Sequence, residues 1–166
     1  MNLGVVCGSF HREEVERMLE FAKAEADSKD LQVRDVVWVP GSMEAPLALD
    51  RMLQSEEIQG AICLGIIERG ETDHGLVMGN SVTMSIIELQ IKHNKPIGLG
   101  IIGPGAEPEH IEPRLEPHAR SAVGAVAAMS GFAVLKIGHS INARAVFAGL
   151  REAVNEMKRL IDSVSS

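Results

Sequence analysis

The chain has 166 residues, a formal net charge of −7 and 45% hydrophobic residues. This length fits one globular domain, and the composition differs from that of a disordered chain. The negative charge, together with the lack of a Lys/Arg-rich block, excludes the electrostatic pattern of a nucleic-acid-binding protein. No apolar run is long enough to cross a membrane, and no basic region precedes the first apolar segment. We therefore expect a cytoplasmic protein that has no membrane partner.

The predicted elements alternate between strands and helices along the chain. In order they are strand 3–7, helix 12–28, strand 33–39, a helix from near Met43 to residue 53, strand 61–66, a helix from Thr72 to about Asn94, and strand 97–102. Helices of this length between strands predict a parallel four-stranded sheet with helices on both faces. Cys7 and Cys63 fall in predicted strands, so we expect buried thiols of a reducing compartment rather than a disulfide.

The rest of the chain is predicted to be mostly helical. We expect a short helix between residues 104 and 117, a helix over 117–129, a connection with an extended piece at 132–137, and a last helix capped by Ser140. That last helix carries an apolar stripe with spacings of three and four residues. Without repeats or an internal linker, the simplest organisation is one domain over 1–130 and a C-terminal extension over 131–166.

The helix predicted from Thr72 is apolar on most of its sides. Its apolar residues are Leu76, Val77, Met78, Val82, Met84, Ile86, Ile87, Leu89 and Ile91. A helix that is apolar nearly all round is buried, either inside its domain or against another subunit. We therefore expect a homo-oligomer.

The segment Gly65–His74 indicates where a ligand binds. A buried strand, a glycine turn and a helix start point free backbone N–H groups at an anion, and His74 lies in the first turn of that helix. The loops that start at Gly8, Pro40 and Gly65 all follow strands, so they should converge at the carboxyl edge of the sheet, where ligands bind in such folds.

Four motifs in this order resemble the 6,7-dimethyl-8-ribityllumazine synthase family, most closely its archaeal branch. They are Gly8-Ser9-Phe10, Val39-Pro40-Gly41-Ser42-Met43-Glu44-Ala45-Pro46, Arg69-Gly70-Glu71-Thr72-Asp73-His74 and Leu99-Gly100-Ile101-Ile102-Gly103-Pro104-Gly105. The resemblance implies a flavodoxin-like three-layer α/β sandwich, assembled into pentamers or multiples of pentamers, with active sites between subunits. It also implies the condensation of 5-amino-6-(ribitylamino)uracil with 3,4-dihydroxy-2-butanone 4-phosphate, without a metal or an organic cofactor.

The resemblance assigns roles to individual residues. His74 corresponds to the catalytic base, whose imidazole suits proton transfer near neutral pH. Phosphate is expected at Gly70, Glu71, Thr72 and Arg114, with Glu71 acting through its backbone. The pyrimidine and ribityl groups are expected at Phe10, Ser42, Met43, Glu44, Ile66, Ile67 and Leu99, with Phe10 stacking on the ring and Glu44 receiving hydroxyls.

Each of these residues also has a purely structural interpretation. His74 could be an ordinary histidine at a helix start, and Thr72 the cap of that helix. Arg114 could be a solvated helix arginine. Phe10 could pack as a hydrophobic staple, and Glu44 could be a first-turn acid that is favoured by the helix dipole.

The chain departs from the family at several positions. Many members have aromatic residues where Met43, Gly75 and Leu99 stand here, and asparagine where His11 stands. Bacterial members have a lysine after the position of Arg114; the candidates to replace it are Arg120 and His118. Two alternatives stay open. One is an archaeal-type riboflavin synthase, which resembles this fold. The other, motivated by the lost aromatic residues and the C-terminal extension, is a non-catalytic flavin-binding or shell protein of the same fold.

Overall fold

The computed structural model describes residues 1–130. The extended piece expected at 132–137 and the helix expected from Ser140 lie outside the described residues. Within residues 1–130, no helix is both long enough and apolar enough to span a membrane.

Four parallel strands form one sheet. They are β1 (Asn2–Gly8), β2 (Gln32–Val39), β3 (Gly60–Glu68) and β4 (Ile97–Ala106), and their order in the sheet is β2-β1-β3-β4. β1 lies between β2 and β3, so that Cys7 is paired with both Trp38 and Leu64. The predicted parallel sheet is confirmed, and each strand is one to four residues longer than the apolar pattern indicated.

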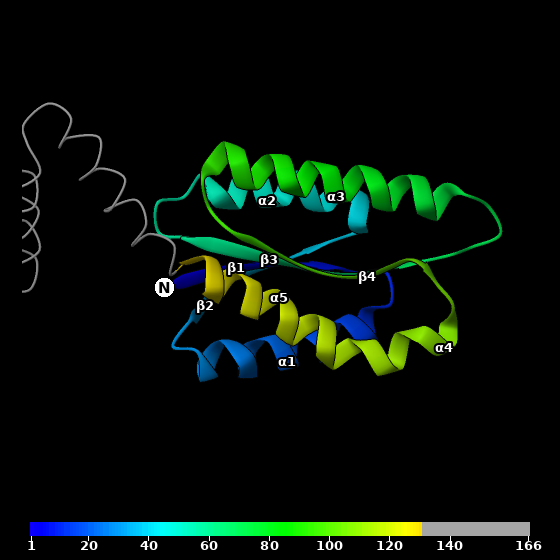
Figure 1. Cartoon of the computed structure of the whole chain (residues 1–166), viewed down its shortest axis with the longest axis horizontal. Helices are drawn as coiled ribbons and strands as arrows, with labels where there is room; N and C mark the ends of the chain where they lie inside the picture. Colours follow the sequence, from blue (N-terminus) through cyan, green and yellow to red (C-terminus); the bar gives the residue numbers. More distant parts are fainter. Residues whose placement is uncertain (131–166) are drawn as a thin grey trace, which may run out of the picture. The chain divides into compact units, whose positions relative to one another are not determined.

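Helices cover both faces of this sheet. The longer ones are α1 (Arg12–Ser28), α2 (Ala45–Leu53), α3 (His74–His93) and α5 (Leu115–Ser130), and the short ones are η1 (Ser42–Glu44), α4 (Pro108–Ile111) and η2 (Glu112–Arg114). Figure 1 shows α2 and α3 on one face and α1 and α5 on the other. This arrangement confirms the predicted three-layer α/β sandwich.

Each face of the sheet has its own apolar core. One core packs side chains of α1 and α5 against the sheet and contains Cys7; the other packs α2 and α3 and contains Cys63. Both thiols are buried and free, and burial raises the pKa of each to about 12. The prediction of two buried cysteines without a disulfide is confirmed.

Three helix starts differ from the prediction. The helix expected over 117–129 is α5, which begins two residues earlier, at Leu115. The helix expected from near Met43 is a single 3₁₀ turn, η1, followed by α2 from Ala45. The helix expected from Thr72 begins at His74, and Thr72 is not its cap, although the hydroxyl of Thr72 accepts a hydrogen bond from the N–H of His74 at 3.4 Å. The turn of β3–α3 therefore extends two residues further than the pattern indicated.

Candidate functional site at the carboxyl edge of the sheet

The three loops that were predicted to converge do meet. A methyl group placed on Gly8 would lie 3.9 Å from Cα of Gly65 and 3.9 Å from the carbonyl carbon of Gly41. The N–H of Ser9 donates to the carbonyl of Val39 at 2.8 Å, which joins the loop after β1 to the end of β2. The carboxyl ends of three strands thus form one edge.

The turn between β3 and α3 is the part of this edge that could bind an anion. Gly70 has a φ of 62°, a left-handed conformation that favours glycine, and the segment from Arg69 to His74 is exposed. His74 is the first residue of α3, so it belongs to the first turn, whose backbone N–H groups have no carbonyl partner within the helix.

Close backbone packing fixes the start of α3 against β3. A Cβ atom on Gly75 would lie 2.4 Å from the carbonyl oxygen of Glu68, and one on Gly79 would lie 2.8 Å from Cγ of Pro104. The aromatic residue that many family members carry after the histidine therefore has no room at position 75 in this structure.

The loop after β1 presents an aromatic ring to solvent. The side chain of Phe10 is 52% exposed, and its ring meets that of His11 edge to face, with centroids 4.6 Å apart. His11 has a left-handed backbone, and its Nε2 atom lies 2.8 Å from Oε1 of Glu68. Glu68 was not predicted as a site residue; a carboxylate ending an otherwise apolar strand was the signal that could have identified it.

The loop after β2 supplies three of the predicted residues. Ser42 is buried, and its Oγ atom would lie 3.3 Å from a Cβ atom on Gly65. Met43 is 72% exposed. Glu44 accepts a hydrogen bond from the N–H of Gly41 at 3.0 Å through Oε2, and it is the acid in the first turn of η1, as its structural interpretation expected.

Ile66 and Ile67 face the two cores, and each is only 2% exposed. Their side chains therefore cannot contact a ligand at the edge. Any contribution of these residues to binding must come from their backbone groups.

Two predicted residues, Leu99 and Arg114, do not belong to the three converging loops. Leu99 lies opposite Cys63, well before the carboxyl end of β4, and is 42% exposed. Arg114 donates a hydrogen bond from Nη1 to the carbonyl of His110 at 2.9 Å, within its own segment.

Arg120, a candidate to replace the family lysine, is engaged elsewhere. It donates to Glu116 at 2.8 Å and to Glu25 at 2.9 Å, and these two hydrogen bonds raise its pKa. It thereby ties α5 to α1. His118 is partly buried on α5. Among the described residues, no cluster of His, Cys, Asp and Glu side chains is arranged to hold a metal ion.

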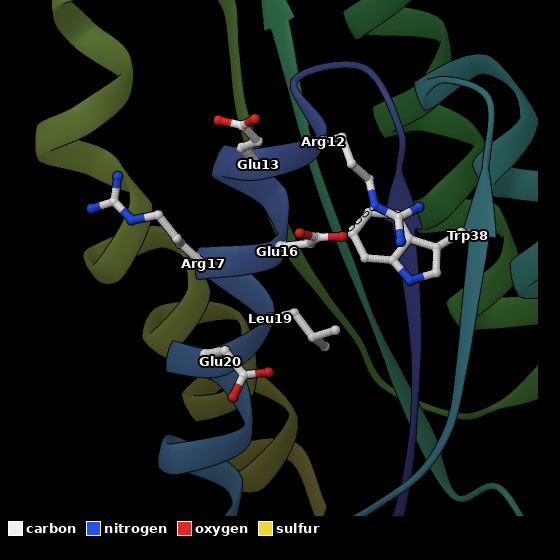
Figure 2. A pocket seen from close by; sticks show the side chains of 7 residues that line it. All are labelled: Arg12, Glu13, Glu16, Arg17, Leu19, Glu20 and Trp38. Carbon is white, nitrogen blue, oxygen red and sulfur yellow. Dashed lines mark hydrogen bonds and ion pairs between the residues drawn. The ribbon is translucent and has the colours of Figure 1, made fainter.

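A groove of about 570 Å³ lies elsewhere, between α1 and β2. Figure 2 shows the guanidinium of Arg12 over the ring of Trp38, 3.4 Å from the ring centroid, and Glu16 accepting a hydrogen bond from Arg12 at 2.6 Å. None of the predicted site residues lines this groove. Phe10, Met43 and the segment 69–74 of the predicted site are exposed in the single chain.

Two family models match parts of the chain. The family model described as 6,7-dimethyl-8-ribityllumazine synthase matches residues 1–136. A second model, described as pyridoxal phosphate biosynthesis protein PdxJ, matches only residues 118–163.

Curated proteins named 6,7-dimethyl-8-ribityllumazine synthase are similar over most of their length. The one from Metallosphaera sedula is 36% identical over 130 residues, which cover 78% of this chain and 86% of the relative. The one from Picrophilus torridus is 33% identical over 137 residues, covering 82% and 96%. The one from Methanobrevibacter smithii is 36% identical over 123 residues, covering 74% and 85%. The chain therefore belongs to the 6,7-dimethyl-8-ribityllumazine synthase family.

Proposed function

We propose that this chain condenses 5-amino-6-(ribitylamino)uracil with 3,4-dihydroxy-2-butanone 4-phosphate to 6,7-dimethyl-8-ribityllumazine. The observation that supports this most is the exposed turn at Gly70 with His74 at the first position of α3, in a chain that matches the family over residues 1–136. The chain then acts as a transferase of riboflavin biosynthesis in the cytoplasm. Residues 1–130 form the catalytic domain, and residues 131–166 form an extension.

His74 is the proposed proton carrier. The reaction joins an amine to a ketone as an imine with loss of water, releases phosphate, and closes a ring with loss of a second water. Protons must therefore move between nitrogen and oxygen atoms at neutral pH, and an imidazole can both accept and donate them. The exposure of His74 leaves its ring accessible to a substrate bound at the turn.

Phosphate is proposed to bind the backbone of Gly70, Glu71 and Thr72 and the first N–H groups of α3. The carboxylate of Glu71 repels phosphate, so this residue contributes only its N–H. Arg114 is proposed to bring a bidentate cation from a neighbouring subunit. Its hydrogen bond to His110 is exposed to water, so replacing it by a hydrogen bond to phosphate costs little free energy.

The pyrimidine and ribityl groups are proposed to bind beside this turn. Phe10 stacks on the pyrimidine ring, and the free carboxylate oxygen of Glu44 receives ribityl hydroxyls. The backbone groups of Ser42, Met43, Ile66 and Ile67 complete this part of the site. Leu99 is proposed to contact the substrate ring of a neighbour.

The proposed assembly is a pentamer or a multiple of pentamers with active sites between subunits. Its support is the outer side of α3, where Leu76, Val77, Met84, Ile87 and Ile91 are exposed in the single chain. An apolar patch of this kind on a soluble chain marks an interaction surface.

An assay with both substrates that follows lumazine fluorescence tests the proposal. We expect turnover well above the uncatalysed condensation, and a loss of about tenfold to a hundredfold in His74→Ala, because positioning retains part of the acceleration. Arg114→Ala should raise the KM for the phosphate substrate and weaken inhibition by inorganic phosphate. Arg51→Ala, an exposed arginine of α2, is the matched control.

A wild-type rate equal to that in buffer would contradict the proposal. Tight binding of lumazine without turnover would then favour a binding or shell protein, and turnover of lumazine alone would favour a riboflavin synthase.

A further inference from the structure

His11 joins the loop after β1 to the end of β3. Its Nε2 atom lies 2.8 Å from Oε1 of Glu68, and its Nδ1 atom lies 3.8 Å from Oε2 of Glu14. Nε2 is shielded from solvent and has no aligned hydrogen-bond partner within residues 1–130. The Glu68 carboxylate is therefore the polar group that offsets the free-energy cost of burying Nε2 of His11. The contact becomes an ion pair when the imidazole is protonated.

The backbone at this position explains which residues it accepts. His11 has φ 56° and ψ 53°. Asparagine and histidine enter this left-handed region more readily than most other residues. The asparagine of many family members thus meets the same backbone requirement. Histidine meets it too and adds a longer side chain that reaches Glu68.

The same imidazole also contacts Phe10. The two rings are 80° apart in plane, with centroids at 4.6 Å, an edge-to-face geometry that aromatic pairs prefer. Phe10 is half-exposed and has solvent on its other side. Because Glu68 holds the imidazole and the imidazole abuts Phe10, the orientation of Phe10 depends on the end of β3.

We infer that His11 and Glu68 are positioning residues that hold Phe10 for the pyrimidine substrate. The inference rests on the proposed function, in which Phe10 stacks on the pyrimidine. With Met43 and Leu99 at positions where many members have aromatic residues, Phe10 is the one phenyl ring among the predicted site residues. Its orientation therefore matters more for affinity here than in a site with several such rings.

Two single variants separate positioning from chemistry. His11→Asn keeps a residue that tolerates the left-handed backbone but removes the reach to Glu68. Glu68→Gln leaves the His11 backbone untouched and removes the charge, so it keeps the test valid if His11→Asn folds poorly. Each should raise the KM for the pyrimidine substrate about two- to fivefold, the range that a partly exposed ion pair supports.

The remaining kinetic constants distinguish positioning of Phe10 from a role in chemistry or in phosphate binding. The kcat and the KM for the phosphate substrate should stay at their wild-type values, because neither side chain carries a proton or contacts phosphate in the proposed mechanism. The double variant should lose no more than either single variant, since both remove one contact. Glu14→Gln is the matched control, because Glu14 faces the same ring at the longer distance of 3.8 Å.

Fluorescence titration with 6,7-dimethyl-8-ribityllumazine gives a readout that is independent of turnover. Weaker lumazine binding in both variants supports the inference, even if the wild type proves inactive and the proposed function fails. Wild-type KM and lumazine affinity in both variants would overturn the inference while leaving the proposed function intact. An equal rise in the KM for both substrates would also overturn it, because a general distortion of the site would explain that result.

Discussion

The position of the proposed base depends on a residue with no side chain. A Cβ atom on Gly75 would lie 2.4 Å from the carbonyl oxygen of Glu68 and 3.4 Å from that of Arg69. These are backbone atoms at the end of a central strand, so they cannot rotate away as a flexible side chain can. Any larger residue at position 75 must push the start of α3, and with it His74, away from the sheet.

Gly75→Ala should therefore lower the free energy of unfolding by about 1–3 kcal/mol, the usual cost of overpacking. The measurement is urea unfolding, followed by far-UV circular dichroism. The matched control is Gly124→Ala in α5, where a Cβ atom meets nothing within 4 Å. That variant should gain up to about 1 kcal/mol from helix propensity. Equal stability of the two variants would contradict this, because it would mean that α3 can shift to accommodate the methyl group without loss of stability.

A carboxylate connects the helices on one face of the sheet. Asp50 in α2 accepts hydrogen bonds from Lys92 at 2.7 Å and Gln54 at 3.2 Å, and its Oδ1 lies 2.8 Å from Nε2 of His93. The contacts with Lys92 and then His93 lower the pKa of Asp50 from 3.8 to about 2. This cluster ties α2 to the end of α3, opposite the end that carries the proposed site.

The stability that Asp50 contributes should depend on pH in one direction. Because its pKa is lower in the folded chain than in the unfolded chain, the contribution is complete above about pH 4 and is lost as the pH falls toward 2. Asp50→Asn should lower the Tm at pH 7, by an amount that shrinks below about pH 4. Thermal unfolding between pH 7 and pH 3 measures this, with Asp35→Asn on exposed β2 as control. A difference that is constant over this range would contradict the prediction.

The helices and strands that could be predicted are those whose own residues carry a recognisable pattern. Helix α1 has the predicted bounds, because its buried residues recur at helical spacing and acids occupy its first turn. The start of α3 could not be predicted, because tertiary packing of Gly75 on β3 decides it, and Thr72 alone resembled a cap. Likewise the convergence of the loops follows from strand order, whereas the contact between His11 and Glu68 depends on side-chain geometry that no local pattern contains.

At the scale of the whole molecule, one helix is only half covered. Gly75, Gly79, Val82 and Ile86 of α3 are buried, whereas Ile91 is 77% exposed and four other large apolar residues of α3 are also exposed. Water is a poor environment for this surface, so burial against other subunits is the physical expectation.

Met84→Asp and Ile91→Asp should each shift the chain from an oligomer toward smaller species. A charge buried in an apolar interface costs far more than one in water. Light scattering coupled to size exclusion measures the mass in micromolar solution. Ala24→Asp, on the exposed side of α1, introduces the same charge and should leave the mass unchanged. A wild-type chain that is monomeric at this concentration would contradict the proposed assembly.

The proposed site combines residues from two neighbouring subunits. His74 and the turn at Gly70 lie at one edge, whereas Arg114 donates its hydrogen bond to the carbonyl of His110 in its own segment. If each site takes His74 from one subunit and Arg114 from the next, two damaged variants can complete each other. Co-expression of His74→Ala with Arg114→Ala then produces some intact sites. In such a site the histidine comes from an Arg114→Ala subunit, and the arginine comes from a neighbouring His74→Ala subunit. With random mixing this is about a quarter of all sites. At a concentration of the phosphate substrate far below the KM of Arg114→Ala, where each variant alone is slow, the mixture should therefore reach about a quarter of wild-type activity.

The control for this experiment is a mixture of the two variants purified separately and combined without subunit exchange. Its activity should equal the mean of the two variants, because no hybrid sites form. If co-expressed hybrids also show only that mean, His74 and Arg114 act within one chain. The guanidinium would then have to leave His110 and turn toward Gly70 in its own subunit, and the reason for an oligomer would be the apolar side of α3 alone.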